Sequence, residues 1–168
     1  MPPFGIRHFA WNGDDAVEGY LAHAPGAMSG ESRRHLAEAL ALVRRRGYAM
    51  AANGPAMRAL RKARILKSGQ ARDAGWRNAA VELSGRLSLP ELQLGDPRDA
   101  GPEGVDFIAA PVFSPTGPVN LQLAITGLSA NLDRRTLARF AERLCSVAAT
   151  ITSATYGHGP DETEWNET

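Results

Sequence analysis

The sequence predicts a mixed α and β fold, in which helices pack against an antiparallel sheet. Two strand-like segments, 107–113 and 119–126, flank a short turn, and the second alternates apolar with polar residues as a half-buried strand does. An amphipathic helix follows, because apolar residues recur every three or four positions from 137 to 151. Such a helix has to cover an apolar surface, and the hairpin is the nearest one.

The hairpin is the strongest local signal in the chain. Ser114, Pro115 and Gly117 stand at the first, second and fourth positions of a turn, as a type I turn prefers. Pro111 cannot donate a ladder hydrogen bond, so we expect it at a sheet edge or a bulge. Strict alternation in the second strand predicts that four apolar residues share one face: Val119, Leu121, Leu123 and Ile125.

One long helix is predicted before the hairpin and another after it. The first is expected to be capped by Ser29 or Ser32 and to end at Gly47. Its buried face comprises Leu36, Leu40 and Val43. The second is expected to be capped by Asn131 or Asp133. Its apolar stripe comprises Leu137, Phe140, Leu144, Val147 and Ile151.

The segment between the first helix and the hairpin is predicted to be partly helical. A short strand is expected over 48–50, and Pro55 can open a helix after it. Another helical stretch is expected near 76–87. Residues 93–104 are rich in Gly, Pro and Asp and predict a loop.

Composition limits the classes of function. The net charge is +1, so no global field attracts nucleic acid. No stretch approaches the roughly 20 apolar residues of a membrane span, and the N-terminus lacks a secretory pattern, so we expect a cytoplasmic protein outside the membrane. Cys145 is the only cysteine, which excludes an internal disulfide framework. No histidine has a second ligand at metal-binding spacing, and no nucleophile elbow or phosphate loop occurs, so no metal, cofactor or enzymatic activity is expected.

Three segments carry a family resemblance, in the same order as in the family. Residues 104–152 read as a strand with two small residues and a proline, a glycine turn, a second strand ending before glycine, a polar loop and a long helix. Upstream, LVRRRGYAM at 42–50 reads as a helix end, a glycine and a strand, and 2–22 read as a strand and a helix. Together they resemble the C-terminal effector-binding domain of IclR-type bacterial transcription regulators, in the form of actinobacterial members.

The resemblance implies an α+β fold related to GAF domains, with a curved antiparallel sheet and helices packed on its faces. It implies binding of a small organic acid effector in a pocket at the sheet's edge. It also implies pairing of subunits as homodimers or dimers of dimers. Residues 1–157 would form the effector-binding and oligomerisation domain, and residues 158–168 an acidic flexible tail.

Two features depart from the family pattern. Residues at about 52–95 are expected to form an extra helical insertion, where most family members have a short loop. The winged helix-turn-helix domain that precedes the effector domain in the family is lacking, so DNA contact is expected only through a domain absent from this chain.

The resemblance also implies a ligand site. Gly5 and Ile6 match a small-residue pair whose backbone N–H groups hold the effector carboxylate. Phe107 matches a small polar or thiol position facing that pocket, and Asp96 or Asp99 matches an acidic pocket residue of some members. A phenyl ring at 107 would favour an aromatic or branched-chain acid over glyoxylate or pyruvate. The alternative interpretation is that Ile6 and Phe107 are core residues.

Two other functions stay open at this point. A small enzyme would use a pocket carboxylate such as Asp99 together with His8, within hydrogen-bond reach in one cleft. A pairing module that has lost its ligand would have a filled pocket instead. Pairing is expected in either case to draw on Phe9 and Trp11, apolar side chains that one small domain does not fully cover.

A basic cluster lies inside the predicted insertion, in a stretch without acidic residues. It comprises Arg58, Arg61, Lys62, Arg64, Lys67 and Arg72. The cluster is either a phosphate-contacting patch or a solvated helix face that meets the acidic tail or a partner subunit.

We expect this chain to show no sequence-specific DNA binding, because it lacks a positioning helix, a turn and a recognition helix. In a mobility-shift assay, any binding through the basic cluster should be weak and should fall with added salt. A shift that selects one DNA sequence and persists at physiological salt would refute this expectation.

Overall fold

The computed structural model describes residues 9–22, 29–66 and 87–159. Within these residues, five α-helices and a three-stranded antiparallel sheet confirm the predicted α+β class. The sheet has the order β1 (Ala49–Ala52), β2 (Val105–Phe113) and β3 (Val119–Thr126). The helices are α2 (Asp14–Ala22), α3 (Gly30–Arg46), α4 (Pro55–Leu66), α6 (Leu89–Leu92) and α7 (Arg134–Ala154), with a short 3₁₀ helix η2 (Pro97–Ala100). In this part of the chain no helix combines the length and the apolar character needed to cross a lipid bilayer.

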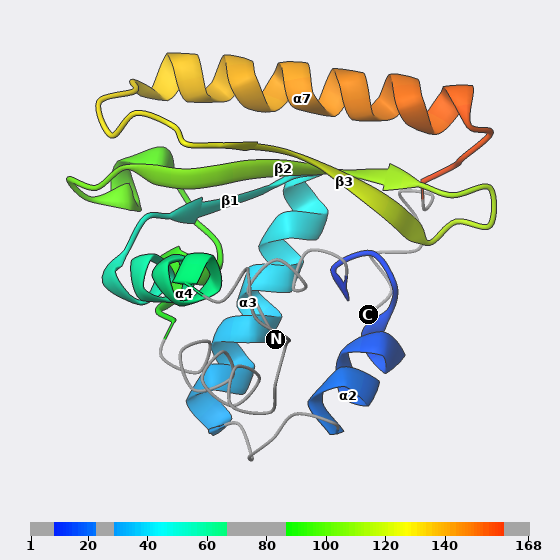
Figure 1. The fold of residues 1–168 in the computed structure, drawn as a ribbon. Helices are drawn as coiled ribbons and strands as arrows, with labels where there is room; N and C mark the ends of the chain where they lie inside the picture. The colour runs from blue at the N-terminus through cyan, green and yellow to red at the C-terminus, as the bar shows by residue number, and fades with distance from the viewer. Residues whose placement is uncertain (1–8, 23–28, 67–86, 160–168) are drawn as a thin grey trace.

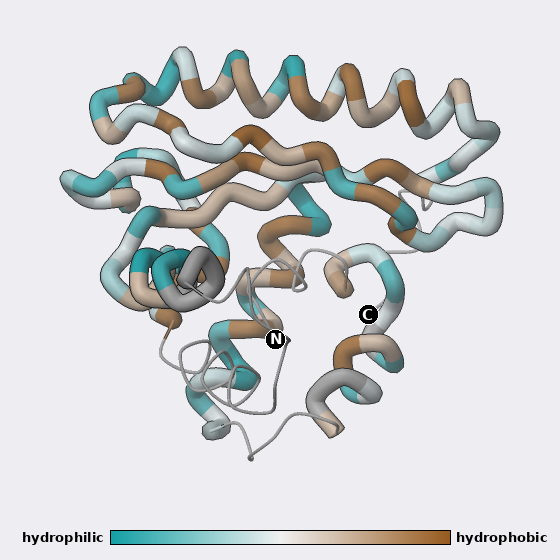
Figure 2. Tube along the Cα trace, in the orientation of Figure 1, coloured by the Kyte–Doolittle hydropathy of each residue, from teal (hydrophilic) through white to brown (hydrophobic). Residues whose placement is uncertain are grey.

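Helices cover both faces of the sheet. In Figure 1, α7 lies along one face, and α2, α3 and α4 lie on the other side. Side chains of the strands alternate between these faces. Ala51 and Phe107 enter the core on the α3 side, while Met50 and Ile108 enter the core beneath α7. Figure 2 shows the hydrophobic residues that follow the strands between the two helical layers.

Helix α3 has the ends and the buried face that its sequence predicts. Ser29 is the N-cap, and its hydroxyl accepts a hydrogen bond from the backbone N–H of Ser32 at 3.1 Å. Gly47 is the C-cap, with a φ of 74° in the left-handed region. The buried residues of the helix are Leu36, Ala39, Leu40 and Val43.

The arginines in the last turn of α3 hold two distant segments. The Nε of Arg44 donates to the carbonyl oxygen of Ala10 at 2.6 Å. The guanidinium of Arg46 donates to the carbonyl oxygens of Leu94 at 2.5 Å and Gly95 at 2.8 Å. These hydrogen bonds hold the end of α3 against the segment before α2 and the loop after α6. The positive charges also suit the negative end of the helix dipole.

The N-terminal segment packs inward, contrary to the expectation that its aromatic rings stay uncovered. Trp11 is 8% exposed, and its ring meets that of Phe113 edge-on at a centroid distance of 6.2 Å. Phe9 is half-buried against the same core. The side chain of Asn12 accepts a hydrogen bond from the backbone N–H of Val119 at 2.9 Å, which fixes this segment to the start of β3.

The hairpin forms as predicted, except at its first apolar residue. Gly117 N donates to Ser114 O at 3.1 Å and closes the turn. Leu123 and Ile125 pack in the core beneath α7, as their alternation predicts. A shift in register next to Phe113 makes Val119 an exception, because it pairs with Phe113 and is buried in the core on the α3 side. The shared face predicted for all four apolar residues is therefore wrong for Val119.

The buried stripe of α7 is rotated from the predicted one. Asp133 is the N-cap, and its carboxylate accepts from Thr136 N at 2.7 Å. Val147 was expected to be buried and is 41% exposed, while Phe140 and Ile151 are only half-buried. The small residues of the observed stripe let the helix lie close to the sheet, which leaves larger apolar side chains on its flank. The buried residues are Leu137, Ala141, Leu144, Ala148 and Thr152.

The predicted insertion is described in part. Helix α4 begins at Pro55, as expected, and α6 supplies one further turn. The short 3₁₀ helix η2 interrupts the predicted loop at 93–104. Residues 67–86, with nearly all of the second predicted helical stretch, lie outside the described residues.

A buried carboxylate fastens α6 to the start of α4. Glu91 is 5% exposed and accepts from Met57 N at 3.0 Å, from Ser88 N at 3.1 Å and from Ser88 Oγ at 2.8 Å. Burial alone would raise the pKa of Glu91, but these hydrogen bonds outweigh it and lower the pKa overall. A Cβ on Gly54 would overlap this carboxylate, so the close approach of the two elements requires glycine there.

Replacing Glu91 by Gln should lower the free energy of unfolding at pH 7 by about 1.5–3 kcal/mol, the scale of hydrogen bonds to a charged group. Because the pKa of Glu91 in the folded chain lies below its ordinary value of 4.5, its contribution is complete above that pH and is lost as the pH falls further. Urea titrations should therefore show the Glu91→Gln deficit shrinking in acid. Glu38→Gln, on an exposed turn of α3, is the matched control and should change little. A deficit that is independent of pH would contradict the assigned role.

Candidate functional site

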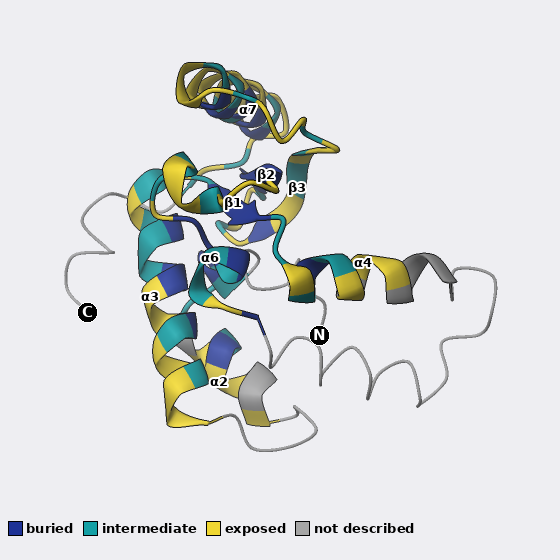
Figure 3. Ribbon diagram, turned by 90° about the vertical axis from the view of Figure 1, so that its left-hand side faces the viewer, coloured by how far each residue is buried: buried dark blue, intermediate teal, exposed yellow. Residues whose placement is uncertain are grey.

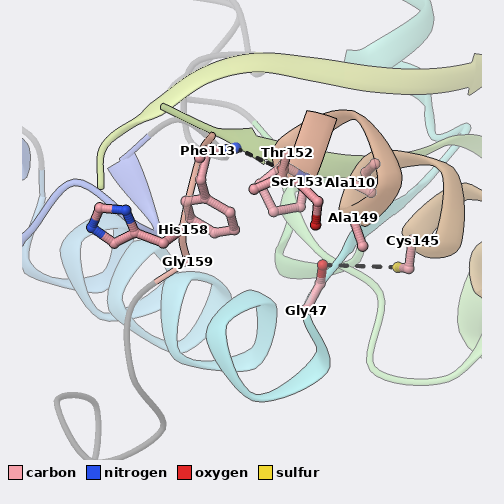
Figure 4. A pocket seen from close by; sticks show the side chains of 12 residues that line it. Gly47, Ala110, Phe113, Cys145, Ala149, Thr152, Ser153, His158 and Gly159 are labelled. Carbon is pink, nitrogen blue, oxygen red and sulfur yellow. Dashed lines mark hydrogen bonds between the residues drawn. The ribbon is translucent and has the colours of Figure 1, made fainter. Parts of the chain in front are cut away.

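A pocket of about 400 Å³ opens beside the end of β2 that β1 does not reach. Ala49, the first residue of β1, lies opposite Ala109, so no described strand pairs with β2 on that side at Pro111 and Phe113. Helix α7 and residues 157–159 close the space instead, together with the C-cap of α3 (Figure 4). The pocket therefore lies at an edge of the sheet.

Pro111 fits this open end because it has no N–H to satisfy. The N–H of Met50 donates to Gln93 Oε1 at 3.1 Å, and the carbonyl of Met50 accepts from Leu94 N at 2.6 Å, so both groups point away from β2. Backbone groups alternate along a strand, which directs those of Ala109 and Pro111 toward the β1 side. Beyond the end of β1 the missing N–H costs no ladder bond, so the predicted edge position of Pro111 is confirmed.

The last turn of α7 takes the place of the missing strand. Phe113 N donates to Thr152 Oγ1 at 3.1 Å, and Gly157 N donates to Thr152 O at 2.7 Å. Gly157 lies directly against the carbonyl of Phe113, where any Cβ would overlap the oxygen. The chain after α7 can therefore close over the end of β2 only because residue 157 is glycine.

The lining of the pocket combines hydroxyl groups with apolar surface. Thr152 and Ser153 bring hydroxyls from α7, and Phe113 brings an aromatic wall from β2. His158 and Gly159, at the start of the predicted tail, complete the rim. Hydroxyls orient freely as donors or acceptors, so the site can hold a compact molecule with a few oxygen atoms.

Cys145 lines the same pocket but has the character of a structural thiol. Its Sγ lies 4.0 Å from the carbonyl oxygen of Gly47, and burial raises the pKa of the thiol. The thiolate, which is the reactive form, is therefore scarce at neutral pH. Figure 4 places Cys145 and His158 at opposite ends of the pocket, so they do not form a nucleophile–base pair.

Among the described residues, none that the resemblance placed at a ligand site lines this pocket. Gly5 and Ile6 lie outside the described residues, as does His8. Phe107 is 1% exposed and packs in the core on the α3 side, which favours the alternative interpretation as a core residue. The physical reason is that residue 107 lies on a central strand, on the face that α3 covers.

Asp96 and Asp99 serve as caps of the short 3₁₀ helix η2. Asp96 accepts from the backbone and the guanidinium of Arg98 at 2.9–3.0 Å, and the Arg98 side chain and backbone hold the pKa of Asp96 well below its usual range. Asp99 accepts from Asp96 N at 3.3 Å and is exposed. Neither carboxylate lines this pocket.

Two members of the basic cluster are partners of acidic side chains within the chain. Arg61 forms an ion pair with Asp106, a carboxylate on β2 that is 4% exposed. The Nη1 atom of Arg58 lies 3.3 Å from the Oε2 atom of Glu103, and it also donates to the carbonyl oxygen of Asn53 at 2.6 Å. These contacts favour a role within the chain over contact with phosphate for both arginines. Arg61 in particular compensates a buried charge that would otherwise be costly. Among the described residues, no group of His, Cys, Asp or Glu side chains has an arrangement that could hold a metal ion.

Sequence patterns missed the observed pocket for a definable reason. Its walls come from the flank of α7, the C-cap of α3 and a glycine after α7, which lie far apart in the chain. The available signal was the run of small residues at Cys145, Ala148, Ala149 and Ser153, which repeats at helical spacing along one flank of α7.

Comparisons of the chain with protein-family models, curated proteins and solved structures find no match. The family resemblance therefore stays a prediction from the sequence.

Phe107→Ala should lower the free energy of unfolding by about 3–5 kcal/mol, because it empties a buried site in the core. Chemical denaturation measures this directly. Phe107→Leu, which keeps most of the volume, should cost less than about 1.5 kcal/mol. A Phe107→Ala variant with unchanged stability and weakened ligand binding would show instead that Phe107 lines the ligand site.

Proposed function

We propose that this chain is the small-molecule-sensing and subunit-pairing domain of an IclR-type transcription regulator. The observation that carries the proposal is the pocket at the open end of β2, which offers hydroxyl groups and an aromatic wall without a paired nucleophile and base. Such a lining suits reversible binding of a small molecule.

The arrangement of elements supports the family part of the proposal. Helix α3, its glycine C-cap and β1 come first. After α4, α6 and η2, the chain continues as strand, turn, strand, polar loop and a long helix. An antiparallel sheet with helices on both faces is the layout that a GAF-like effector domain requires. The pocket also lies at a sheet edge, where the resemblance implies the effector site, although its described lining contains none of the implied residues.

The proposed effector is a compact organic acid with an apolar body. Its oxygen atoms would accept hydrogen bonds from the hydroxyls of Thr152 and Ser153, and its apolar part would pack on Phe113. The pocket lies beside the C-terminal end of α7, where the helix carries partial negative charge and has no basic residue in its last turn. A monoacid is therefore preferred over a dicarboxylate, and an aromatic or branched body over pyruvate or glyoxylate.

Thermal denaturation with benzoate, 3-methylbutanoate, pyruvate, glyoxylate and malonate tests this proposal. An acid present at 100 times its Kd should raise the free energy of unfolding by about 2.7 kcal/mol. The first two should raise the Tm, and the other three should raise it less at equal concentration. Failure of all five acids to move the Tm would contradict the sensing role.

A matched pair of variants locates the site on α7. Ala149 is exposed and lines the pocket, so Ala149→Phe should fill the pocket, keep the fold and abolish the shift caused by benzoate. Ala138→Phe makes the same change on an exposed position three turns earlier, and should leave the shift intact. Equal shifts in both variants would show that the acid binds elsewhere.

A further inference from the structure

The backbone groups around the pocket are unequally divided between donors and acceptors. The N–H groups of Gly47, Phe113 and Gly157 already donate hydrogen bonds within the chain. Pro111 has no N–H at all. These four lining residues therefore present backbone carbonyls to a ligand, but no backbone donor.

The carbonyl of Pro111 points into the space that β1 does not fill. Both backbone groups of Met50 point away from β2, so those of Ala49 point toward Ala109, with which it is paired. Pro111 follows two residues later on the same edge, and its carbonyl lies beyond the end of β1, where no described strand supplies a donor. Because Pro111 lines the pocket, this oxygen is an acceptor for a bound molecule.

The carbonyl of Gly47 is a second acceptor of the pocket. Its oxygen lies 4.0 Å from the Cys145 thiol, a weak donor, and Figure 4 shows it directed across the pocket toward that side chain. Gly47 is the C-cap of α3, so this carbonyl stands at the negative end of a helix. A donor stronger than a thiol would therefore be stabilised at this position.

The charged side chains nearby do not occupy these acceptors. None of the three arginines in the last turn of α3 lines the pocket, and Arg44 and Arg46 donate to backbone carbonyls elsewhere. The C-terminal end of α7, which borders the same space, has no basic residue in its last turn. His158 lies at the opposite end of the pocket from Cys145 (Figure 4). Two negative helix ends thus border a pocket whose described lining contains no lysine or arginine.

We propose that the effector carries an ammonium group in addition to its carboxylate, so that the pocket binds an α-amino acid with an aromatic or branched side chain. An ammonium has three donors and no acceptor, which suits the carbonyls of Gly47 and Pro111. The carboxylate accepts from the hydroxyls of Thr152 and Ser153, and the apolar side chain packs on Phe113. This inference rests on the proposed function and narrows its class of effector.

A zwitterion also suits the charge and the size of the site. The C-terminal end of α7 repels a carboxylate alone, whereas an ammonium on the same molecule is attracted to both helix ends (Figure 3 shows α3 and α7 on opposite sides of the sheet). The volume of about 400 Å³ lies near the lower end of the roughly 300–1,000 Å³ typical of ligand pockets. This volume favours a molecule with a single ring or a short branched chain.

Isothermal titration calorimetry with three probes that share one phenyl ring separates the two charges. L-Phenylalanine carries both groups, 3-phenylpropanoate lacks the ammonium, and 2-phenylethylamine lacks the carboxylate. The Kd of L-phenylalanine should be lower than that of either other probe by about tenfold, the scale of one hydrogen bond to a charged group.

The pattern of failure separates this inference from the proposed function. If 3-phenylpropanoate binds as tightly as L-phenylalanine, the ammonium site is wrong and the sensing of plain acids stands. If 2-phenylethylamine binds as tightly, the amino acid is wrong because its carboxylate contributes nothing. Absence of binding by all three probes and by benzoate would overturn both proposals.

Charge variants at Ser153, an exposed residue that lines the pocket, test the location. Ser153→Lys supplies an ammonium from the chain itself, so the preference for L-phenylalanine over 3-phenylpropanoate should disappear. Ser153→Asp should weaken 3-phenylpropanoate more than 2-phenylethylamine, because the two carboxylates repel each other. Ala138→Lys is the control, since this exposed position lies about 22 Å earlier along α7, well beyond the Debye length of about 10 Å. A preference that survives in Ser153→Lys as it does in Ala138→Lys would overturn the assignment.

Discussion

Strand β2 has to be covered on both faces and supplied with hydrogen bonds on both edges. Eight of its nine residues are buried, so α7 must cover one face while α3 and its neighbours cover the other. Its edges are served unequally, because β3 runs along nearly all of it and β1 has only four residues. The end of β2 beyond β1 is completed by Thr152 and Gly157, which makes the pocket a direct consequence of the short strand.

Buried polar groups hold the remaining elements to this sheet. Glu91 gathers backbone N–H groups at the start of α4, and Arg61 compensates the buried Asp106 on β2. Each of these charges is paired or hydrogen-bonded, as a low-dielectric interior demands. Arg61, which the sequence placed in a possible phosphate-contacting patch, therefore has a structural role within the chain.

The two flanks of α7 carry side chains of different size. The helix itself packs on β2 through small residues. Alanines at 141 and 148 let it lie close to the strand. On one flank the small side chains leave a pocket, and on the other the larger Val147 stays partly exposed beside β3. The position of α7 on β2 therefore determines where the pocket opens.

Local signals in the sequence determined the hairpin, both ends of α3 and the existence of α7. A turn, an alternation or a cap depends on neighbouring residues, so Gly117 and Gly47 could be placed without knowledge of the fold. Tertiary structure decided which stripe of α7 is buried, why Val119 turns to the opposite core and where the pocket lies. These outcomes depend on strand lengths, on a bulge and on how closely Gly157 approaches Phe113, which are properties of distant segments in contact. The same holds for Phe107, whose burial follows from the central position of its strand rather than from any local pattern.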